Sequence, residues 1–390
     1  MNHQPLTIVL TGGGSGGHIT PLLSLARELK KLSPDCRIVY VGHRGDDFGS
    51  LNINTHDFDF MVFIKAGKFR RYHSANRLAQ LLDLKTLALN IRDFFRLPGS
   101  IYLSIQLMNK FKPDIMFSKG GFVSVPVGVA ARLKGVPIVT HDSDVVPGLA
   151  NRIIGRWAKV HATGMPAKYY NYPRHSIVHI GIPIDERIIK VTPKIQADSK
   201  KQLKLPPDSQ ILLLSGGGNG SVRLNELMVS ISRSLLESNL ALYVVHLTGS
   251  GHEQAVNTAY ATALEKTQRD RVITAGFTND FYSYSAAADL IITRAGATTL
   301  AELGAAGKAC IVIPSPYLTG GHQLKNADEL EKLDAAAVVS EDVQPDELLV
   351  MVSELLKNQH RRFELSRNLF GTSHPDAAAK LAQLIIKTAK

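Results

Sequence analysis

Short apolar runs alternate with longer segments of helical periodicity along this chain. The runs are three to six residues long and rich in β-branched side chains, which predicts buried strands. Buried strands that alternate with helices indicate a parallel sheet covered on both faces. In the first part of the chain the predicted strands are Thr7–Leu10, Arg37–Val41, Met61–Ile64, Asp114–Phe117, Pro137–Thr140 and Val160–Ala162.

The same alternation resumes after a stretch rich in proline and lysine, Pro193–Pro207. A second parallel sheet is therefore predicted, and 390 residues are enough for two domains with full cores. The fold class is thus α/β, with two doubly wound domains. In the second domain the predicted strands are Ile211–Leu214, Leu242–Leu247, Val272–Ala275, Leu290–Thr293, Ala309–Ile313 and Ala336–Val339.

Composition excludes several classes of protein. The two cysteines, Cys36 and Cys310, lie in apolar strand-like runs, which excludes a disulfide scaffold and predicts buried, reduced thiols. The first ten residues have neither the basic start nor the long apolar run of a signal peptide. No apolar run reaches the length of a membrane span. These features are typical of a cytosolic protein.

The chain is basic, with a formal net charge of +11 and a pI near 9.5, which favours an acidic partner. Residues 65–96 hold eight Lys and Arg against two acids, a net charge of +6. Apolar side chains follow helical spacing in the same stretch: Leu78, Leu81, Leu82, Leu87, Ile91, Phe94 and Phe95. A basic amphipathic helix suits an anionic membrane surface better than nucleic acid. The alternative is a surface helix whose apolar stripe packs on its own domain.

A glycine-rich turn, Thr11–His18, joins the first strand to the first helix. Its five glycines let the backbone approach a ligand closely, and the helix start points unpaired N–H groups at an anion. The turn lacks the Lys and Ser or Thr of a P-loop and fits the dinucleotide fingerprint only loosely. His18 could take a proton from a hydroxyl beside a bound diphosphate, or it could merely cap the helix.

Two further polar loops follow strands of the first domain, at Ser118–Ser124 and at His141–Asp144. Because ligands bind beyond the carboxyl ends of parallel strands, we expect these loops to meet the first glycine turn in one cleft. The second domain repeats the pattern with the glycine loop Ser215–Ser221. Two such domains suggest anion sites that face each other across a cleft, as in an enzyme that joins two phosphorylated substrates.

Two clusters in the second domain have the chemistry to bind a nucleotide sugar. Thr293–Glu302 is a strand end, a turn and a helix start whose N–H groups and hydroxyls suit phosphate oxygens. In the later cluster, Gln323 and Asn326 share one helix face and could read sugar hydroxyls. Taken singly, each cluster could equally be a capped helix.

These motifs, taken in order along the chain, resemble those of the MurG family of glycosyltransferases. The matching segments are Gly12–His18 followed by Pro21, Gly120–Pro126, Pro147–Gly148 with Asn151, Arg294–Glu302 and His322–Ala327. The resemblance implies a GT-B fold, in which two Rossmann-like domains face each other across a cleft. It implies inverting transfer of N-acetylglucosamine from UDP-GlcNAc to the MurNAc C4 hydroxyl of undecaprenyl-diphospho-MurNAc-pentapeptide. This step converts lipid I to lipid II in peptidoglycan synthesis, and so serves cell-wall biogenesis, cell shape and cell division.

The resemblance also implies a domain organisation and a location. Residues 1–164 would bind the acceptor and face the membrane, residues 165–371 would bind UDP-GlcNAc, and a helix in 372–390 would return to the first domain. The enzyme would be a peripheral protein on the cytoplasmic face of the cell membrane, held by the basic stretch 65–96. Its partners would be UDP-GlcNAc, lipid I and other cell-wall synthesis proteins, with no nucleic acid.

Site residues follow from the same resemblance. His18 would be the catalytic base, and Asp142 would orient the acceptor or replace His18 as the base. The implied acceptor-binding residues are Gly13, Gly14, Gly16, Gly17, Gly120, Gly121 and Asn151. The implied donor-binding residues are Gly217, Gly218, Asn219, Gly220, Ser221, Phe277, Thr278, Ala297, Thr298, Thr299, Glu302, Gln323 and Asn326.

The chain departs from the family pattern at three places. Gly218 stands where a serine is usual, Asp185 where a diphosphate-binding arginine is usual, and His141–Asp144 where His-Glu-Gln-Asn is usual. Loss of the arginine should weaken donor binding unless Arg187 replaces it. Two alternatives therefore stay open, a related lipid glycosyltransferase with another UDP-sugar or acceptor, and a non-catalytic UDP-sugar-binding scaffold.

Other chemistry is less favoured. Asp142 and Asp144 spell the Asp-X-Asp pattern of metal-dependent GT-A enzymes, but they lie in the acceptor half, so we expect no metal and no cofactor. A UDP-GlcNAc 2-epimerase has the same two-domain shape but would need no lipid. A dinucleotide oxidoreductase is disfavoured because the second strand ends in Val41-Gly42-His43 rather than in an acid.

Overall fold

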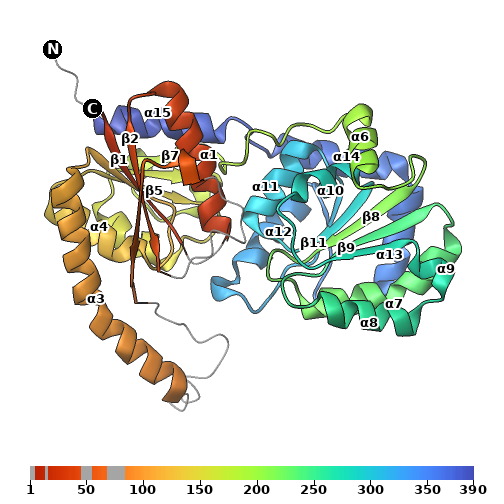
Figure 1. Ribbon diagram of the computed structural model, residues 1–390. Coiled ribbons are helices and arrows are strands. Elements are labelled where there is room, and N and C mark those ends of the chain that lie inside the picture. Colours follow the sequence, from red (N-terminus) through yellow and green to blue (C-terminus); the bar gives the residue numbers. More distant parts are fainter. Residues whose placement is uncertain (1–4, 14–15, 45–54, 68–83) are drawn as a thin grey trace. The chain divides into compact units, whose positions relative to one another are not determined.

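The computed structural model describes residues 5–13, 16–44, 55–67 and 84–390 (Figure 1). The chain divides into two compact units. The first unit is formed by Met1–Glu186 together with His374–Lys390, and the second by Arg187–Ser373. Each unit is built around one fully parallel sheet, as the alternation of apolar runs and helices predicts.

The first unit holds a seven-stranded sheet in the order β3-β2-β1-β4-β5-β6-β7. All strands run parallel, but successive strands are added on one side of β1 as far as β3 and on its other side from β4 onward. The place between β1 and β4 is the reversal point of the sheet. There the two strands are neighbours, with Thr11 opposite Ser118. In a doubly wound sheet this is the point where loops diverge and a ligand can enter. The strands are β1 (Thr7–Thr11), β2 (Arg37–His43), β3 (Phe60–Ile64), β4 (Ile115–Ser118), β5 (Ile138–Asp142), β6 (Val160–Thr163) and β7 (Ile177–His179).

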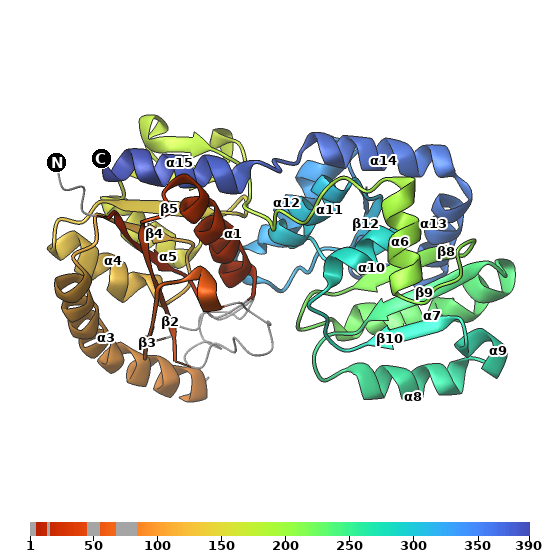
Figure 2. The same ribbon diagram turned by 45° about the horizontal axis from the view of Figure 1, so that its top comes forward.

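Helices cover both faces of this sheet (Figure 2). On one face, Ile8 and Leu10 of β1 pack with side chains of α1 and α15, whereas Val9, which points the other way, packs with those of α3 and α4. Successive side chains of β1 thus alternate between the cores on the two faces of the sheet. The helices of the first unit are α1 (Gly16–Leu32), α3 (Leu84–Phe111), α4 (Ser124–Leu133), α5 (Leu149–Ile154) and α15 (Ala377–Ala389), with 3-10 turns η1 (Thr55–Asp57), η2 (Gly155–Trp157), η3 (Ala167–Tyr169) and η4 (Arg174–Ser176).

The first unit is longer than the sequence predicts. Strand β7 pairs with β6, with Val178 opposite Ala162, and carries the unit past the expected boundary at residue 164 to Glu186. Its three residues are too few and too exposed for an apolar run to reveal them. At the far end of the chain, α15 begins at Ala377 and packs against α1, so the first unit contains both ends of the sequence.

The second unit holds a six-stranded sheet in the order β10-β9-β8-β11-β12-β13. The reversal point of this sheet lies between the parallel strands β8 and β11, where Ser215 lies opposite Thr293. In β8, Leu212 and Leu214 join one core while Ile211 and Leu213 join the other. The strands are β8 (Gln210–Ser215), β9 (Leu242–Leu247), β10 (Val272–Ala275), β11 (Leu290–Thr293), β12 (Cys310–Val312) and β13 (Ala337–Val338). The helices are α6 (Pro193–Gln202), α7 (Val222–Ser238), α8 (Glu253–Ala263), α9 (Lys266–Arg269), α10 (Phe281–Ala287), α11 (Ala297–Ala306), α12 (His322–Lys332), α13 (Pro345–Lys357) and α14 (Gln359–Gly371), with the 3-10 turn η5 (Thr319–Gly321).

All twelve strands predicted from apolar runs are present, with shifts of one or two residues at their ends. One shift changes the site, because β5 continues through His141 and Asp142, which were expected in a loop. Both side chains are buried as a result. Among the helices of the described residues, none has the length and apolar character needed to cross a bilayer.

Replacing Leu381 with alanine tests whether α15 is a structural part of the first unit. Its side chain is fully buried in the core shared with α1 and β1, so Leu381→Ala should lower the free energy of unfolding by about 2–5 kcal/mol. Urea denaturation followed by circular dichroism measures this. Gln383→Ala, at an exposed position of the same helix, is the control. A loss below about 1 kcal/mol for Leu381→Ala would contradict the packing.

Candidate active site

Two glycine loops meet at the reversal point of the first sheet. The first follows β1 and contains Gly12 and Gly13, and the second follows β4 and contains Gly120 and Gly121. Gly121 has a φ of +82°, and a Cβ on it would lie 2.6 Å from the carbonyl oxygen of Gly13. The loops therefore touch backbone to backbone, which only glycine allows. This confirms that the two loops lie together, as the sequence predicts.

Two helices begin beside these loops. Helix α1 starts at Gly16, and α4 starts at Ser124 with an N-cap residue, Val123, that supplies no side-chain hydrogen bond. A helix start offers a partial positive charge to an anion. At α4 the N–H groups of Ser124 and Val125 already donate to the carbonyls of Gly121 and Phe122, at 3.1 and 3.4 Å, and the next residue is a proline, so this start contributes mainly its partial charge. Gly14 lies outside the described residues. Gly16, Gly17 and His18 are described only through the backbone of α1, so the direction of the His18 side chain stays a prediction.

Asn151 links the carboxyl ends of β4 and β5. It accepts a hydrogen bond from the Ser118 hydroxyl at 2.9 Å, and its amide nitrogen donates to the carbonyl of His141 at 2.8 Å and to Oδ1 of Asp142 at 3.0 Å. The side chain is 1% exposed. In this structure the polar atoms of Asn151 serve the protein itself, so a direct contact with the acceptor, as the family resemblance implies, stays a prediction.

Asp142 is buried and held on both oxygens. Oδ1 also accepts the backbone N–H of Gly148 at 3.3 Å, and Oδ2 accepts the Tyr172 hydroxyl at 3.0 Å. Burial raises the pKa of Asp142, while these hydrogen bonds oppose the shift. A general base needs a free oxygen within reach of the substrate hydroxyl. The geometry therefore favours Asp142 as a group that fixes the end of β5, and it leaves His18 as the better candidate base.

His141, next in the chain before Asp142, is also buried. Its Nε2 lies 2.9 Å from the carbonyl oxygen of Gly181. Burial keeps the pKa of His141 well below its usual range, so the ring is neutral. A neutral ring bonded to backbone fixes the linker that follows β7, and it is poorly placed for proton transfer to a substrate.

The glycine loop of the second unit is supported from behind by another turn. Gly217 and Gly220 have φ values of +88° and +71°, and a Cβ on Gly220 would collide with the carbonyl oxygen of Thr248. Gly249 packs equally closely on Gly220. The sequence analysis missed this supporting turn, although Thr248-Gly249-Ser250-Gly251 directly after a strand was a usable signal.

Arg294 ties the same glycine loop to the end of β11. It donates to the Ser221 hydroxyl at 2.6 Å, to Oε1 of Glu341 at 2.6 Å and to the carbonyl of Ile313 at 3.1 Å. Ser221 also caps α7 by accepting the N–H of Leu224 at 3.4 Å. Its hydroxyl is thus engaged within the protein, and a contact with phosphate stays a prediction.

Residue 218 lies close to the ring of Phe277. A Cβ on Gly218 would lie 3.3 Å from the Phe277 ring, closer than most Cβ contacts in proteins. The ring is 39% exposed beside the loop, where a flat base could stack on it. Thr278, the next residue, accepts the N–H of Asp280 at 3.0 Å. Asn219, at the tip of the loop, is exposed.

The first turn of α11 carries Ala297, Thr298 and Thr299, and its N-cap residue, Gly296, supplies no side-chain hydrogen bond. Because β11 is the neighbour of β8 at the reversal point, this helix start and the glycine loop after β8 share one edge of the sheet. Glu302 lies in the next turn and is half-buried. The structure therefore brings two helix starts, α7 and α11, to one edge of the sheet, an arrangement that suits an anion.

Gln323 and Asn326 anchor α12 to the loops of this edge. The side-chain oxygen of Gln323 accepts the N–H of Ser315 at 2.9 Å, and Asn326 donates to the carbonyl of Ala295 at 3.1 Å. Both side chains are buried. They share one helix face, as expected, and their reading of sugar hydroxyls stays a prediction.

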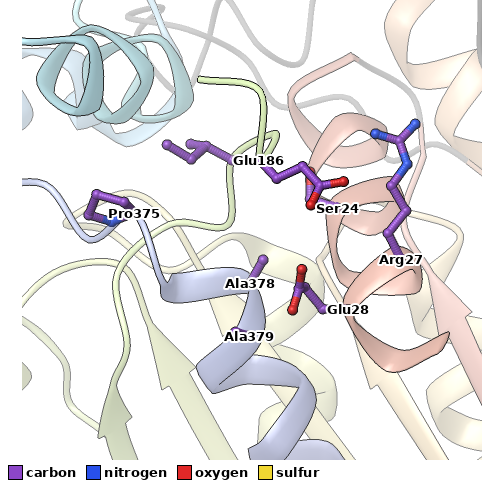
Figure 3. Close-up of a pocket in the computed structure, with 8 residues that line it drawn as sticks. Ser24, Arg27, Glu28, Glu186, Pro375, Ala378 and Ala379 are labelled. Carbon is purple, nitrogen blue, oxygen red and sulfur yellow. The ribbon is translucent and has the colours of Figure 1, made fainter. Parts of the chain in front are cut away.

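Asp185, the acid found where an arginine is usual, has a partner in the first unit. Oδ2 of Asp185 lies 3.1 Å from Nη1 of Arg27 on α1, and Arg27 also pairs with Asp57 at 3.0 Å. A small pocket of about 50 Å³ opens beside Arg27 and the start of α15, far smaller than a ligand site (Figure 3). The carboxylate is thus neutralised by α1 rather than buried as an unpaired charge.

The first unit and the second each match one half of a known enzyme family. Residues 8–163 match the glycosyltransferase family 28 N-terminal domain, and residues 211–381 match the C-terminal domain of the same family. These matches follow the two sheets with their glycine loops. The chain therefore belongs to glycosyltransferase family 28, with the GT-B class of fold.

Named relatives show which enzymes of this family the chain is similar to. The "UDP-N-acetylglucosamine--N-acetylmuramyl-(pentapeptide) pyrophosphoryl-undecaprenol N-acetylglucosamine transferase" of Natranaerobius thermophilus is 31% identical over 97% of this chain and 99% of its own length. The enzyme of the same name from Bacillus pumilus is 29% identical over 97% of this chain and 98% of its own. MurG of Acinetobacter baumannii, a solved structure, superposes with a TM-score of 0.70 at 24% identity, covering 98% of this chain and 100% of that one. The predicted resemblance to the MurG family is thus confirmed.

A side chain at position 121 should separate the two glycine loops of the first unit. Gly121→Ala adds strain at positive φ and a collision with Gly13, so we expect at least a tenfold loss of glycosyl transfer, together with a stability loss of about 1–3 kcal/mol. Gly135→Ala is the matched control, because Gly135 has a φ of +71° but no heavy atom within 4 Å of the added Cβ. Equal activity losses in the two variants would show that strain alone, and not the loop contact, is responsible.

Proposed function

We propose that this chain transfers N-acetylglucosamine from UDP-GlcNAc to the MurNAc C4 hydroxyl of undecaprenyl-diphospho-MurNAc-pentapeptide, and so converts lipid I to lipid II in peptidoglycan synthesis. One observation carries the proposal. Each unit presents a glycine loop and a helix start at the reversal point of its sheet, in a chain that matches an enzyme named for this transfer over 99% of that enzyme's length.

The donor half of the reaction belongs to the second unit. The diphosphate of UDP would lie on the loop Gly217–Gly220 and on the first turn of α11, with the uracil beside Phe277. As the bond from the sugar C1 to the diphosphate oxygen breaks, UDP leaves with the electron pair. Backbone N–H groups at the start of α11 would stabilise the negative charge that grows on this oxygen. Because they supply this charge stabilisation, we propose that the transfer needs neither a metal ion nor a cofactor.

The acceptor half belongs to the first unit. The diphosphate of the lipid would lie on the loops that contain Gly13 and Gly121, beside the starts of α1 and α4. His18, at the start of α1, would take the proton from the C4 hydroxyl as its oxygen attacks the anomeric carbon. Attack from the side opposite the leaving group inverts that carbon.

Release of UDP tests this proposal directly. The purified protein with UDP-GlcNAc and a soluble lipid I analogue should release UDP in proportion to the acceptor, and the rate should persist when EDTA is added. No release with the acceptor present, despite donor binding in calorimetry, would favour the non-catalytic scaffold. Release with another UDP-sugar in preference to UDP-GlcNAc would favour a related lipid glycosyltransferase.

The matched variant for this assay is His18→Ala. Loss of a general base should lower kcat by about 10²- to 10⁴-fold while the affinity for UDP-GlcNAc stays within about twofold, because the donor residues belong to the other unit. Unchanged turnover would remove His18 from the mechanism.

We further propose that α3 attaches the enzyme to the cytoplasmic face of an anionic membrane. Figure 1 shows the amino-terminal half of this helix projecting beyond the sheet of the first unit. Four of its large apolar side chains are exposed there, at 40% for Leu87, 50% for Ile91, 58% for Phe94 and 74% for Phe95. These exposures support the membrane contact over packing of the stripe on its own domain. The predicted apolar residues 78, 81 and 82 lie outside the described residues.

The arginines of α3 also support a membrane contact on this surface. Asp93, the acid in this part of α3, is 2% exposed and lies 3.1 Å from both Arg92 and Arg96. The arginines are about half exposed. An outward face that combines aromatic rings with arginines can bury the rings among acyl chains and attract anionic headgroups.

Phe95→Glu tests the membrane contact. Removing a ring and adding a negative charge should weaken binding to phosphatidylglycerol-containing vesicles at least tenfold, as measured by co-sedimentation, without lowering turnover of a soluble acceptor. Phe363→Glu, at a position 63% exposed on α14 of the second unit, is the matched control and should leave vesicle binding unchanged. Equal losses in both variants would argue against α3 as the contact.

A further inference from the structure

Lys119 lies at the start of the glycine loop that follows β4, next to the glycine loop that follows β1. It directly follows β4, precedes Gly120 and is 3% exposed. Its backbone N–H donates to the carbonyl of Thr11 at the end of β1, at 2.9 Å, and its ammonium donates to the hydroxyl of Ser143, just beyond β5. One residue thus joins the carboxyl ends of β1, β4 and β5. The sequence analysis passed over it.

The ammonium of Lys119 is buried, and no ion pair is found for it among the described residues. Asp142 and Asp144 attract it electrostatically, but the oxygens of Asp142 are engaged by other groups, as described above. Within the described ranges, Ser143 is the hydrogen-bond acceptor found for a group with three N–H donors. A buried charge with so few partners costs folding free energy. Such a cost is typical of a group kept for function rather than for stability.

A second buried lysine provides the comparison. Lys308, in the second unit, is 7% exposed, and its ammonium donates to the carbonyl of Ala286 at 3.1 Å. Burial lowers the pKa of both lysines to about 8. Lys308 precedes β12 and so lies at the amino-terminal edge of its sheet, away from the loops that bind substrates. The two lysines match in burial and differ in place.

We propose that Lys119 is a positioning residue for the acceptor: its ammonium holds the loops after β4 and β5 together and supplies positive charge beneath the glycine loops that receive the acceptor diphosphate. The inference rests on the proposed function, because it assigns a residue to that site. Gly120 is its neighbour in the chain, and Gly121 touches Gly13, so a change at Lys119 reaches both glycine loops.

The charge of Lys119 should make acceptor binding depend on pH. The ionisable groups that face it are Asp142, Asp144 and His141, with Tyr170 and Tyr172 behind Asp142. The pKa of His141 is held well below its usual range by burial, and the pKa values of both tyrosines are raised by burial. Because burial lowers the pKa of Lys119 to about 8, its ammonium loses its charge near that pH, and the cationic form predominates below it.

The effect on stability has the opposite sign. Because the pKa of Lys119 is lower in the folded protein than in the unfolded chain, the unfolded state binds more protons between about pH 8 and pH 10.5. The protonated side chain thus destabilises the fold at neutral pH, and this cost fades as the pH rises through that window. Acceptor binding should weaken as the pH rises past about 8, where Lys119 of the folded protein loses its charge. A functional role of Lys119 therefore predicts weaker acceptor binding above about pH 8, whereas a structural role predicts only the change in stability.

The test compares Lys119→Met, Lys119→Arg and Lys308→Met from pH 6.5 to pH 9 with a soluble lipid I analogue. Lys119→Met should raise the acceptor KM about tenfold or more at pH 7, leave the donor KM within about twofold and remove the rise in acceptor KM that wild type shows above pH 8. Lys119→Arg, charged throughout, should keep a low acceptor KM at pH 9. Lys308→Met should leave the acceptor KM and its pH profile as in wild type.

Two results would overturn the inference. One is a wild-type acceptor KM profile in Lys119→Met, with any loss confined to melting temperature, which would mean a structural role only. The other is an equal rise in acceptor KM for Lys308→Met, which would mean a general effect of losing a buried lysine. If wild type releases no UDP, the proposed function fails, and binding of farnesyl diphosphate to wild type and Lys119→Met by calorimetry still decides whether Lys119 serves an anion site.

Discussion

Close approach of backbone to backbone at the reversal point of each sheet is the constraint on which the rest of this structure depends. In the first unit Gly121 lies on Gly13, and in the second Gly220 lies against Thr248 and Gly249. Neither approach tolerates a Cβ, and both bring helix starts to the edge of a parallel sheet, where peptide N–H groups face outward. Side chains then hold these loops from behind: the buried Asn151 and Lys119 in one unit, and the partly buried Arg294 in the other.

The sequence predicts much of this, because strands buried on both faces have a signal that does not depend on their neighbours. Strand β1 shows why: three consecutive apolar residues fill two cores. Strand β7 has three half-exposed residues and no such signal. The hydrogen bonds around Asp142 could not be predicted from the sequence, for a different reason. Tyr172 meets Asp142 across 30 residues of chain, and no local pattern specifies that pairing. Exposure of Phe95 was undecidable for a similar reason, since spacing alone does not say which face of a helix meets a neighbour.

The departures from the family pattern gain a physical account from the same contacts. Gly218 leaves room for the ring of Phe277, and Asp185 forms an ion pair with Arg27. Each change is therefore matched by a partner inside its own unit. Under the proposed function, the UDP diphosphate would meet the helix starts of α7 and α11, because Asp185 stands where the family pattern has an arginine.

The return of α15 to the first unit has a consequence for how the protein is made. Leu381 and Ile385 of α15 belong to the same core as Ile8 and Leu10 of β1, the first strand to be synthesised. The half that emerges first from the ribosome therefore cannot complete its core until the last residues of the chain have emerged, whereas the second unit, Arg187–Ser373, is contiguous and can fold in the meantime. A nascent chain halted before α15 would carry a complete second unit and a first unit with one face of its sheet partly uncovered.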